Sequence, residues 1–342
     1  MNAPEDRPTI AAAALAGLSH LRAQPLGCGH YLPAQVLTND ELSQRLDTSD
    51  AWIHSRTGIR QRHIAAESET TSDLATKAAE AALAHAGIDA ASLDGLVLAT
   101  ATPDQTFPST ATRVQHRIGM TGGFAFDVGA ACAGFVYALA TANALIVSGQ
   151  ARRVLVIGAE TFSRILDWND RATCVLFGDG AGALILEATR GNGDASDRGI
   201  LATCLHSDGA HNRILHTDGG PSTTKTGGVV RMEGKEVFRH AVVKLAEVAE
   251  EAMAKAGVTG AEIDWLVPHQ ANLRIIESTA KKAGVPMDKV VVSVHDHGNT
   301  SAASIPLALS TAVADGRIQA GQLLLMEGIG GGLAWGSALM RW

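Results

Sequence analysis

Short apolar runs alternate with longer segments whose apolar residues have helical spacing along most of the chain. Buried strands are predicted for four apolar runs, at 93–100, 123–130, 152–160 and 322–330. Helices are predicted for three segments, at 70–87, 109–120 and 133–149. Two further short strands are predicted around a glycine-rich turn within 172–188. This alternation predicts an α/β architecture with mainly parallel central strands.

The second half of the chain repeats the plan of the first. Residues 247–270 match 77–100 in register, because Asp264 follows Asp94 by as many positions as Val267 follows Val97. The later elements are predicted as a helix at 273–285, a strand at 289–294 and a helix from about Ser301. The repeat is too long for a solenoid. We therefore predict two duplicated halves, 25–190 and 191–342, after an N-terminal extension at 1–24.

Composition narrows the class of protein. The chain has 342 residues, of which 46% are hydrophobic, and its formal net charge is −7. This size permits two substantial cores, and the negative charge disfavours a general nucleic-acid-binding protein. No run of about 18 apolar residues predicts a membrane-spanning helix. The four cysteines form no C-x-x-C pair, so we expect reduced thiols and a cytoplasmic location.

Three residues with chemically useful side chains directly follow predicted strands. Cys132 follows the strand at 123–130, His269 follows the apolar run before Pro268, and Asn299 follows the strand at 289–294. Sites in open α/β sheets form beyond the carboxyl ends of the strands, where loops converge. The duplication assigns Cys132 to one half and the other two residues to the second. A site at the interface of the two halves is therefore expected.

The residues alone leave the chemistry of this site open. Cys132 would lie at the first turn of a helix, where free N–H groups and the helix dipole favour a thiolate. A buried free cysteine is the common alternative. His269 could equally be a loop histidine without a role, and Asn299 could belong to an ordinary turn. The thiol is therefore a nucleophile candidate that the rest of the chain must support.

Two other candidate sites are disfavoured. His295 and His297 form an H-x-H pair, but no other cluster of suitable spacing completes a metal site. The glycine-rich segments 177–184 and 327–336 do not follow the G-x-G-x-x-G register of a dinucleotide site, and no P-loop sequence is present. Close approach of the backbone to another backbone or to a ligand explains these glycines better. We therefore predict no metal and no nucleotide cofactor.

Several long motifs occur in one order along almost the whole chain. They are GCGHYLP, DTSDAWIHSRTGIRQRHIA, GAACAGFVYAL, FGDGAGA, PHQAN, HGNTSAAS and GGGLAWGSAL. From about Leu26 to Trp342 the chain thereby resembles the β-ketoacyl-[acyl-carrier-protein] synthase III branch of the thiolase-like condensing enzymes. The resemblance implies a five-layer αβαβα thiolase-like fold with two pseudo-duplicated halves, and a homodimer.

The resemblance also implies a reaction. Cys132, His269 and Asn299 would form the catalytic triad, and the N–H groups of Cys132 and Gly331 would form the oxyanion hole. Cys132 would accept an acetyl or other short acyl group from acyl-CoA. Malonyl-acyl-carrier-protein would then lose carbon dioxide and attack the acyl-cysteine, which initiates fatty acid biosynthesis. A related synthase or acyltransferase of secondary metabolism with the same triad is the alternative.

Substrate contacts are likewise implied by the resemblance. Trp52 and Arg171 would enclose the adenine of coenzyme A, and Arg56 would meet its phosphates. The pantetheine tunnel would be lined by Gly234, Phe238 and Asn272. The acyl pocket would include Phe107, supplied to the dimer mate, and Ile329, where many relatives carry phenylalanine. Packing roles are the plain alternatives for Trp52 and both phenylalanines.

A basic patch matches the expected carrier protein. Arg274, Lys281 and Lys282 recur at helical spacing after His269, and Arg239 directly follows Phe238. Because carrier proteins are acidic, a cationic rim beside the tunnel fits docking. Without the resemblance, a solvated helix face explains the same residues equally well.

Overall fold

The computed structural model describes residues 21–342, so most of the predicted extension at 1–24 lies outside the described residues. The first sheet has five strands in the order β1-β7-β6-β4-β5. Their bounds are β1 Leu21–Tyr31, β4 Gly95–Ala99, β5 Phe124–Val128, β6 Arg153–Glu160 and β7 Gly180–Arg190. Strand β4 runs parallel to β5 and β6, whereas β7 is antiparallel to both β6 and β1. Residues 21–24 are therefore part of this sheet.

The second sheet repeats four strands of the first. Its order is β11-β12-β13-β8, with β11 Trp265–Pro268, β12 Leu323–Gly330, β13 Ala334–Arg341 and β8 Gly199–Ser207. Strands β11 and β12 are parallel, and β13 is antiparallel to both β12 and β8. The parallel pair β11 and β12, with β11 at the edge of the second sheet, matches β4 and β6 of the first sheet. This correspondence agrees with the predicted duplication.

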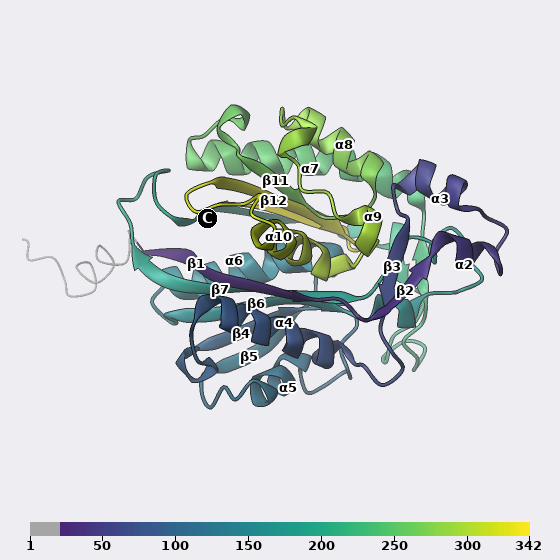
Figure 1. The fold of residues 1–342 in the computed structure, drawn as a ribbon, viewed down its shortest axis with the longest axis horizontal. Helices are drawn as coiled ribbons and strands as arrows, with labels where there is room; N and C mark the ends of the chain where they lie inside the picture. The colour runs from purple at the N-terminus through teal and green to yellow at the C-terminus, as the bar shows by residue number, and fades with distance from the viewer. Residues whose placement is uncertain (1–20) are drawn as a thin grey trace, which may run out of the picture.

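Helices cover both sheets in layers (Figure 1). Helices α4 Thr71–Ala86 and α5 Thr110–Arg117 lie on the outer face of the first sheet, and α7 Gly234–Ala256 and α8 Leu273–Lys282 on that of the second. Helices α6 Gly134–Val147 and α10 Ser304–Ala314 lie between the sheets. The result is the predicted αβαβα order. No helix within residues 21–342 is both long and apolar enough to span a membrane.

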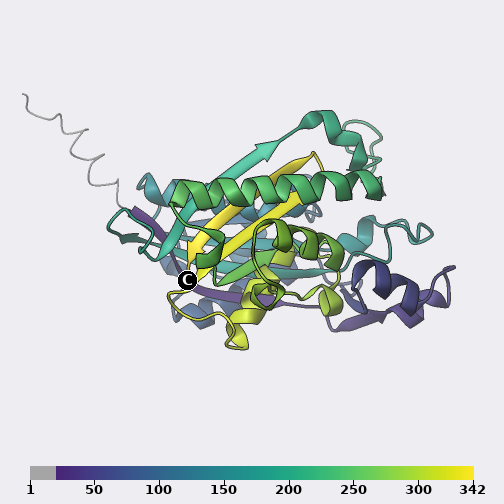
Figure 2. The ribbon, with the colours of Figure 1, turned by 90° about the horizontal axis from the view of Figure 1, so that it is seen from above.

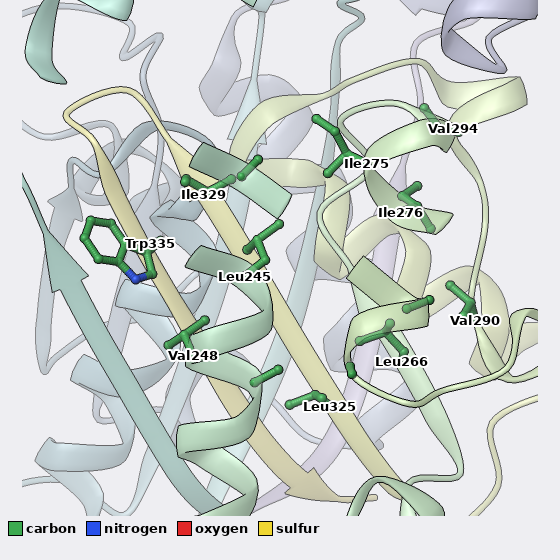
Figure 3. Close-up of a cluster of buried hydrophobic side chains, with 14 of the residues drawn as sticks. Leu245, Val248, Leu266, Ile275, Ile276, Val290, Val294, Leu325, Ile329 and Trp335 are labelled. Carbon is green, nitrogen blue, oxygen red and sulfur yellow. The ribbon is translucent and has the colours of Figure 1, made fainter. Parts of the chain in front are cut away.

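Each layer boundary is a hydrophobic core. Leu324 and Met326 on β12 point into the central core with α6 and α10, whereas Leu325 points to the outer core with α7 and α8. This alternation follows from the period of two along a strand. Figure 3 shows the outer core, where Leu245 and Val248 of α7 pack over the sheet. The central core lies directly beneath the turns that carry the candidate site.

Smaller elements lie around these layers. There are two small antiparallel sheets of two strands each. One pairs β2 Gln35–Thr38 with β3 Gln61–Ile64, and the other pairs β9 Leu215–Thr217 with β10 Val230–Met232. The short helices are α2 Asn39–Ser43, α3 Asp50–Thr57 and α9 Val294–His297. Figures 1 and 2 show α2 and α3 at one end of the layers, near the end of α8. They form a rim on that end of the molecule.

Local signals explain the helix that was predicted best. The N-cap Thr70 and Asp73 form a capping box at the start of α4, and Gly87 ends the helix at a φ of 65°. The alanines of α4 pack against β1 and β7, because small side chains let a helix approach a sheet closely.

The predicted strand at 289–294 is wrong. Val290 makes only an isolated bridge to Leu266, and α9 begins at Val294. The side chain of Gln270 explains this, because its Oε1 accepts the N–H groups of Ser293 and Val294 at 2.8 and 3.1 Å. The buried Gln270 side chain thus accepts backbone N–H groups that would otherwise pair with a neighbouring strand.

The two short strands predicted within 172–188 are also corrected. Residues 171–176 form turns, in which the N–H groups of Thr173 and Cys174 donate to Asp170 O at 3.1 and 3.0 Å. Phe177 makes only an isolated bridge to Asn299, and one long strand, β7, follows. The bridge matters for function, because it ties this segment to a candidate site residue. Within the two main sheets, strands β1, β8 and β13 have no counterpart among the predicted strands.

Candidate active site

Cys132 lies in a tight turn between β5 and α6. The turn is a 3₁₀ segment, Ala131–Ala133, that begins at a φ of 45° at Ala131, and Cys132 itself is 4% exposed. Two glycines of β12 allow the turn to approach. A Cβ at Gly330 would lie 2.5 Å from Cys132 N, and one at Gly328 would lie 3.2 Å from Cys132 O. The strand of one half therefore holds the cysteine turn of the other half.

His269 follows β11 and is held on both sides. Its backbone N–H donates to Glu327 O at 2.8 Å, and its Nδ1 lies 2.6 Å from Ser304 Oγ. The imidazole is 3% exposed, and burial lowers its pKa to about 3. The ring is therefore neutral throughout the physiological pH range.

Asn299 has one end of its carboxamide already occupied. Its Oδ1 accepts the N–H of Ser301 at 2.9 Å, and its backbone N–H donates to Leu176 O at 2.9 Å. Ser301 opens the 3₁₀ segment Ser301–Ala303 at a φ of 48°, which repeats the geometry of Ala131. Because Oδ1 is used by the backbone, the Nδ2 hydrogens remain available as donors.

The three residues line one cavity of about 640 Å³, as the sequence predicts. A second cavity of about 290 Å³ is lined by Cys132, Gly331 and apolar side chains that include Phe162, Ile165 and Val230. Cys132 therefore lines both the larger and the smaller cavity. Such a position suits a nucleophile that receives a group from one side and holds it on the other.

Electrostatics keep the resting thiol neutral. Burial raises the pKa of Cys132 to about 12, and the charge of Glu160 adds to this rise. Cys132 lies in the 3₁₀ segment directly before α6, which begins at Gly134. The dipole can act on negative charge only once charge develops during reaction.

Glu160 at the end of β6 connects the loop after β4 to the turn that follows Asn299. Its carboxyl accepts the N–H of Ala101 at 3.0 Å, the hydroxyl of Thr102 at 2.5 Å and the N–H of Ala302 at 3.4 Å. The side chain is 0% exposed, and burial raises its pKa to about 7. Sequence reasoning missed this residue, because a single glutamate at a strand end gives no local signal.

Four of the predicted substrate contacts line the large cavity. They are Arg56, Gly234, Phe238 and Asn272. Asn272 also caps α8, because its Oδ1 accepts the N–H of Ile275 at 3.0 Å. Its amide group therefore has a fixed direction beside the cavity. Ile329, predicted for the acyl pocket, lines this larger cavity.

Trp52 and Arg171 lie together on the rim but are not among the residues that line the cavity. The Trp52 ring has Arg56 at 4.9 Å and Arg171 at 5.4 Å from its centroid. Arg171 also bonds to the backbone oxygen of Asp47 and to its carboxylate. The predicted stacking on an adenine stays a prediction, for which this aromatic and cationic group is suitably exposed.

The basic residues divide into two positions. Arg274 lines the cavity and lies 5.5 Å from the Phe238 ring centroid. Lys281 and Lys282 are exposed in the last turn of α8, about 10 Å further along the helix. The exposed Arg239 pairs with Glu236 at 2.5 Å. Only Arg274 of these four basic residues therefore lines the cavity.

Phe107 is not brought to the site within this chain. Its side chain is 81% exposed, the largest exposure among the exposed large hydrophobic residues of the described chain. The small cavity is instead lined by Phe162, Ile165, Leu215 and Val230, which sequence reasoning did not find. They come from three segments, Phe162–Ile165, β9 and β10, that only the fold brings together.

Two family models match the chain at the segments that form this site. The model described as 3-oxoacyl-[acyl-carrier-protein] synthase III matches residues 126–209, and that of its C-terminal part matches residues 253–342. The first contains Cys132, and the second contains His269 and Asn299.

Whole-chain comparisons agree with these matches. The chain is 65% identical to a β-ketoacyl-[acyl-carrier-protein] synthase III of Jannaschia sp. (strain CCS1), with 94% of this chain and 99% of the relative covered. It is 48% identical to the solved structure of 3-oxoacyl-[acyl-carrier-protein] synthase III from Aquifex aeolicus VF5, with a TM-score of 0.87 and coverage of 94% and 100%.

A third relative comes from another pathway. The solved priming β-ketosynthase of the R1128 polyketide biosynthetic pathway is 36% identical, with a TM-score of 0.87 and coverage of 100% of this chain and 98% of that one. The family matches, the identity over nearly the full length and the shared fold lead to one conclusion. This chain belongs to the 3-oxoacyl-[acyl-carrier-protein] synthase III family.

Proposed function

We propose that the protein is a β-ketoacyl-[acyl-carrier-protein] synthase III that condenses a short acyl-CoA with malonyl-acyl-carrier-protein. The observation that carries the proposal is the position of Cys132, which separates two cavities and shares the larger one with His269 and Asn299. Family membership supports the same reaction. No metal or other cofactor enters this chemistry.

In the first half-reaction, the Cys132 sulfur attacks the carbonyl carbon of acyl-CoA. The bond from that carbon to the CoA sulfur breaks, the acyl group stays on Cys132, and the thiol proton leaves with CoA. The N–H groups of Cys132 and Gly331 are proposed to hold the oxyanion. Because the thiolate is the attacking form, the Cys132 thiol gives up its proton as the new carbon–sulfur bond forms, and the CoA sulfur takes up one proton as it leaves.

In the second half-reaction, malonyl-acyl-carrier-protein enters the large cavity and loses carbon dioxide. Negative charge develops on its thioester oxygen, and His269 and Asn299 are proposed to donate hydrogen bonds to it. The resulting carbanion attacks the acyl carbon, and the Cys132 thiolate leaves and regains a proton. Each preorganised donor lowers the barrier by about 3 kcal/mol.

The large cavity suits a long thioester arm. Its volume of about 640 Å³ and its lining by Gly234, Phe238 and Asn272 support a pantetheine tunnel. Arg56 is proposed to meet the CoA phosphates, with Trp52 and Arg171 at the adenine. Arg239, Arg274, Lys281 and Lys282 are proposed to dock the acidic carrier protein. The four cysteines are free and buried, which supports a cytoplasmic protein.

A related synthase of secondary metabolism is the second candidate, favoured by the similarity to the R1128 priming β-ketosynthase.

Purified protein incubated with a panel of acyl-CoAs should gain the mass of one acyl group, preferentially a short one. Addition of malonyl-acyl-carrier-protein should then release carbon dioxide and form the β-ketoacyl carrier protein. Acylation without turnover of malonyl-acyl-carrier-protein would favour another acceptor and contradict the proposal.

A homodimer is also proposed. Strand β5 forms an edge of the first sheet, its five residues are only half-buried, and the Phe124 and Phe126 rings stack on it at 5.9 Å. The exposed Phe107 lies in the loop before α5. An exposed edge strand and a large exposed aromatic residue are both features that a partner chain covers.

Phe107→Ala is expected to weaken this dimer about 10- to 100-fold in Kd, because burial of a phenylalanine is worth about 1.5–3 kcal/mol. Sedimentation equilibrium over a dilution series measures the change. Met287→Ala serves as the control, since Met287 is 40% exposed and lies outside this region. A monomeric wild-type protein, or equal Kd values for the wild type and Phe107→Ala, would contradict the role given to Phe107.

A further inference from the structure

Ser304 makes a hydrogen bond that bears directly on the chemistry of His269. It is the first residue of α10, it is 1% exposed, and its Oγ lies 2.6 Å from His269 Nδ1. The backbone N–H of Gln270 donates to the same oxygen at 3.3 Å. The hydroxyl therefore has two partners, both from the segment after β11.

The direction of the bond to His269 follows from counting donors and acceptors. A serine hydroxyl has one hydrogen and two lone pairs, and the N–H of Gln270 uses one lone pair. Within residues 21–342, no further hydrogen bond of the Ser304 hydroxyl exists, so His269 Nδ1 is the sole acceptor for its hydrogen. A neutral imidazole that accepts at Nδ1 carries its own hydrogen on Nε2.

We propose that Ser304 is a positioning residue that holds His269 in the Nε2–H tautomer, so that the imidazole is a hydrogen-bond donor toward the reacting thioester. This inference rests on the proposed function. In the opposite tautomer, Nε2 would present a lone pair to the developing enolate oxygen, which would oppose the charge that the site must stabilise. Ser304 and the Ser301 N–H thus perform the same task for the two donors of the site, His269 and Asn299.

The proposal assigns Ser304 to one half-reaction. An imidazole fixed as Nε2–H has no lone pair at Nε2 to take a proton from Cys132, so acylation should depend little on Ser304. Decarboxylative condensation needs the donor. Ser304→Ala is therefore expected to lower condensation about 10- to 100-fold, which is part of the loss caused by removing one such donor. Acyl transfer from acyl-CoA should change less than about threefold.

The chain offers a matched control on the same helix. Ser310 is also buried in α10, and its Oγ lies 2.9 Å from Nδ1 of His30, a histidine that lines neither cavity at Cys132. Ser310→Ala removes an equivalent buried serine–histidine contact and should leave both half-reactions unchanged. Ser304→Thr keeps the hydroxyl and should restore condensation. A similar loss in Ser310→Ala, or no rescue by threonine while the variant stays folded, would overturn the proposal.

The tautomer itself is the decisive measurement. Two-bond ¹H–¹⁵N correlation spectra of the full-length protein labelled with ¹⁵N-histidine distinguish Nδ1–H from Nε2–H rings, and the His269 signal is identified by its loss in His269→Gln. We expect a non-titrating Nε2–H pattern in the wild type and in Ser304→Thr, and its loss in Ser304→Ala. An Nδ1–H pattern in the wild type, or an unchanged Nε2–H pattern in Ser304→Ala, would refute the role of Ser304. Carbon dioxide release from malonyl-acyl-carrier-protein by the wild type tests the proposed function separately.

Discussion

Cys132→Ala is expected to abolish the transfer of an acyl group from acyl-CoA to the protein, with a loss of turnover greater than about 10,000-fold. The reason is chemical, because within residues 21–342 no other nucleophilic side chain lines both cavities. Alanine at this position leaves the turn intact, since its neighbours Ala131 and Ala133 already have side chains of that size. Intact-mass analysis after incubation with acyl-CoA gives the result directly.

Cys28 provides the matched control for this experiment. Its thiol is also buried, at 4% exposure, and burial raises its pKa to about 11, close to the value for Cys132. It lies on β1 and lines neither cavity. Cys28→Ala should therefore be acylated as fast as the wild type. Acylation with continued turnover in Cys132→Ala would show that another residue is the nucleophile.

The comparison of Cys28 with Cys132 also shows what makes a buried thiol functional here. Their burial and pKa are nearly the same, so neither property separates them. The difference is access, because only Cys132 faces empty space on two sides. Two glycines of β12 and the left-handed turn at Ala131 hold it there. Backbone conformation, more than a low resting pKa, defines this site.

Much of the architecture could be predicted from local signals in the sequence. The capping residues of α4 and the apolar runs of β4, β6 and β12 directly determine short-range structure. The repeat of Asp94 and Val97 at Asp264 and Val267 predicted the duplicated sheets. The predicted strand at 289–294 is wrong, because the carboxamide of Gln270, which is distant in sequence, makes hydrogen bonds with the backbone of this segment. A contact of this kind has no local pattern.

The site shows the same division. Cys132, His269 and Asn299 could be singled out because each follows a strand-like run and lies in a family-like motif. Ser304 and Glu160 could not be assigned roles, because those roles depend on tertiary contacts, Ser304 with His269 and Glu160 with Ala302 of the other half. The wall of the small cavity was missed for the same reason. Phe162, Leu215 and Val230 belong to three segments whose meeting is a tertiary property.

Replacing the two polar partners of Cys132 should separate the half-reactions. His269→Ala and Asn299→Ala are each expected to reduce condensation about 100- to 1,000-fold, the effect of losing one preorganised donor. Acylation of Cys132 should fall much less, because its oxyanion is held by backbone N–H groups of Cys132 and Gly331 in the proposed scheme. Intact mass follows the acyl-enzyme, and carbon dioxide release follows the decarboxylation.

The pH dependence sharpens this test. Burial lowers the pKa of His269 to about 3, so the imidazole remains neutral, and its donor role constant, from about pH 5 upward. His269→Ala should therefore lower condensation by a similar factor at pH 6 and pH 8. A base that titrates near neutrality would instead give a loss that grows as pH rises through its pKa.

Asn299→Asp and His269→Ala also distinguish a hydrogen-bond donor to the substrate from a residue that only supports the structure. Asn299 lines the large cavity and accepts the N–H of Ser301 through Oδ1, which leaves Nδ2 as the proposed donor. Asn299→Asp keeps the acceptor for Ser301 but replaces the donor, so it should lose condensation like Asn299→Ala while retaining the fold. If Asn299→Asp condensed at the wild-type rate, the hydrogen bond to Ser301 would be the function of this residue. Equal losses of acylation and condensation in His269→Ala would likewise make the imidazole a partner of Cys132 in the first half-reaction.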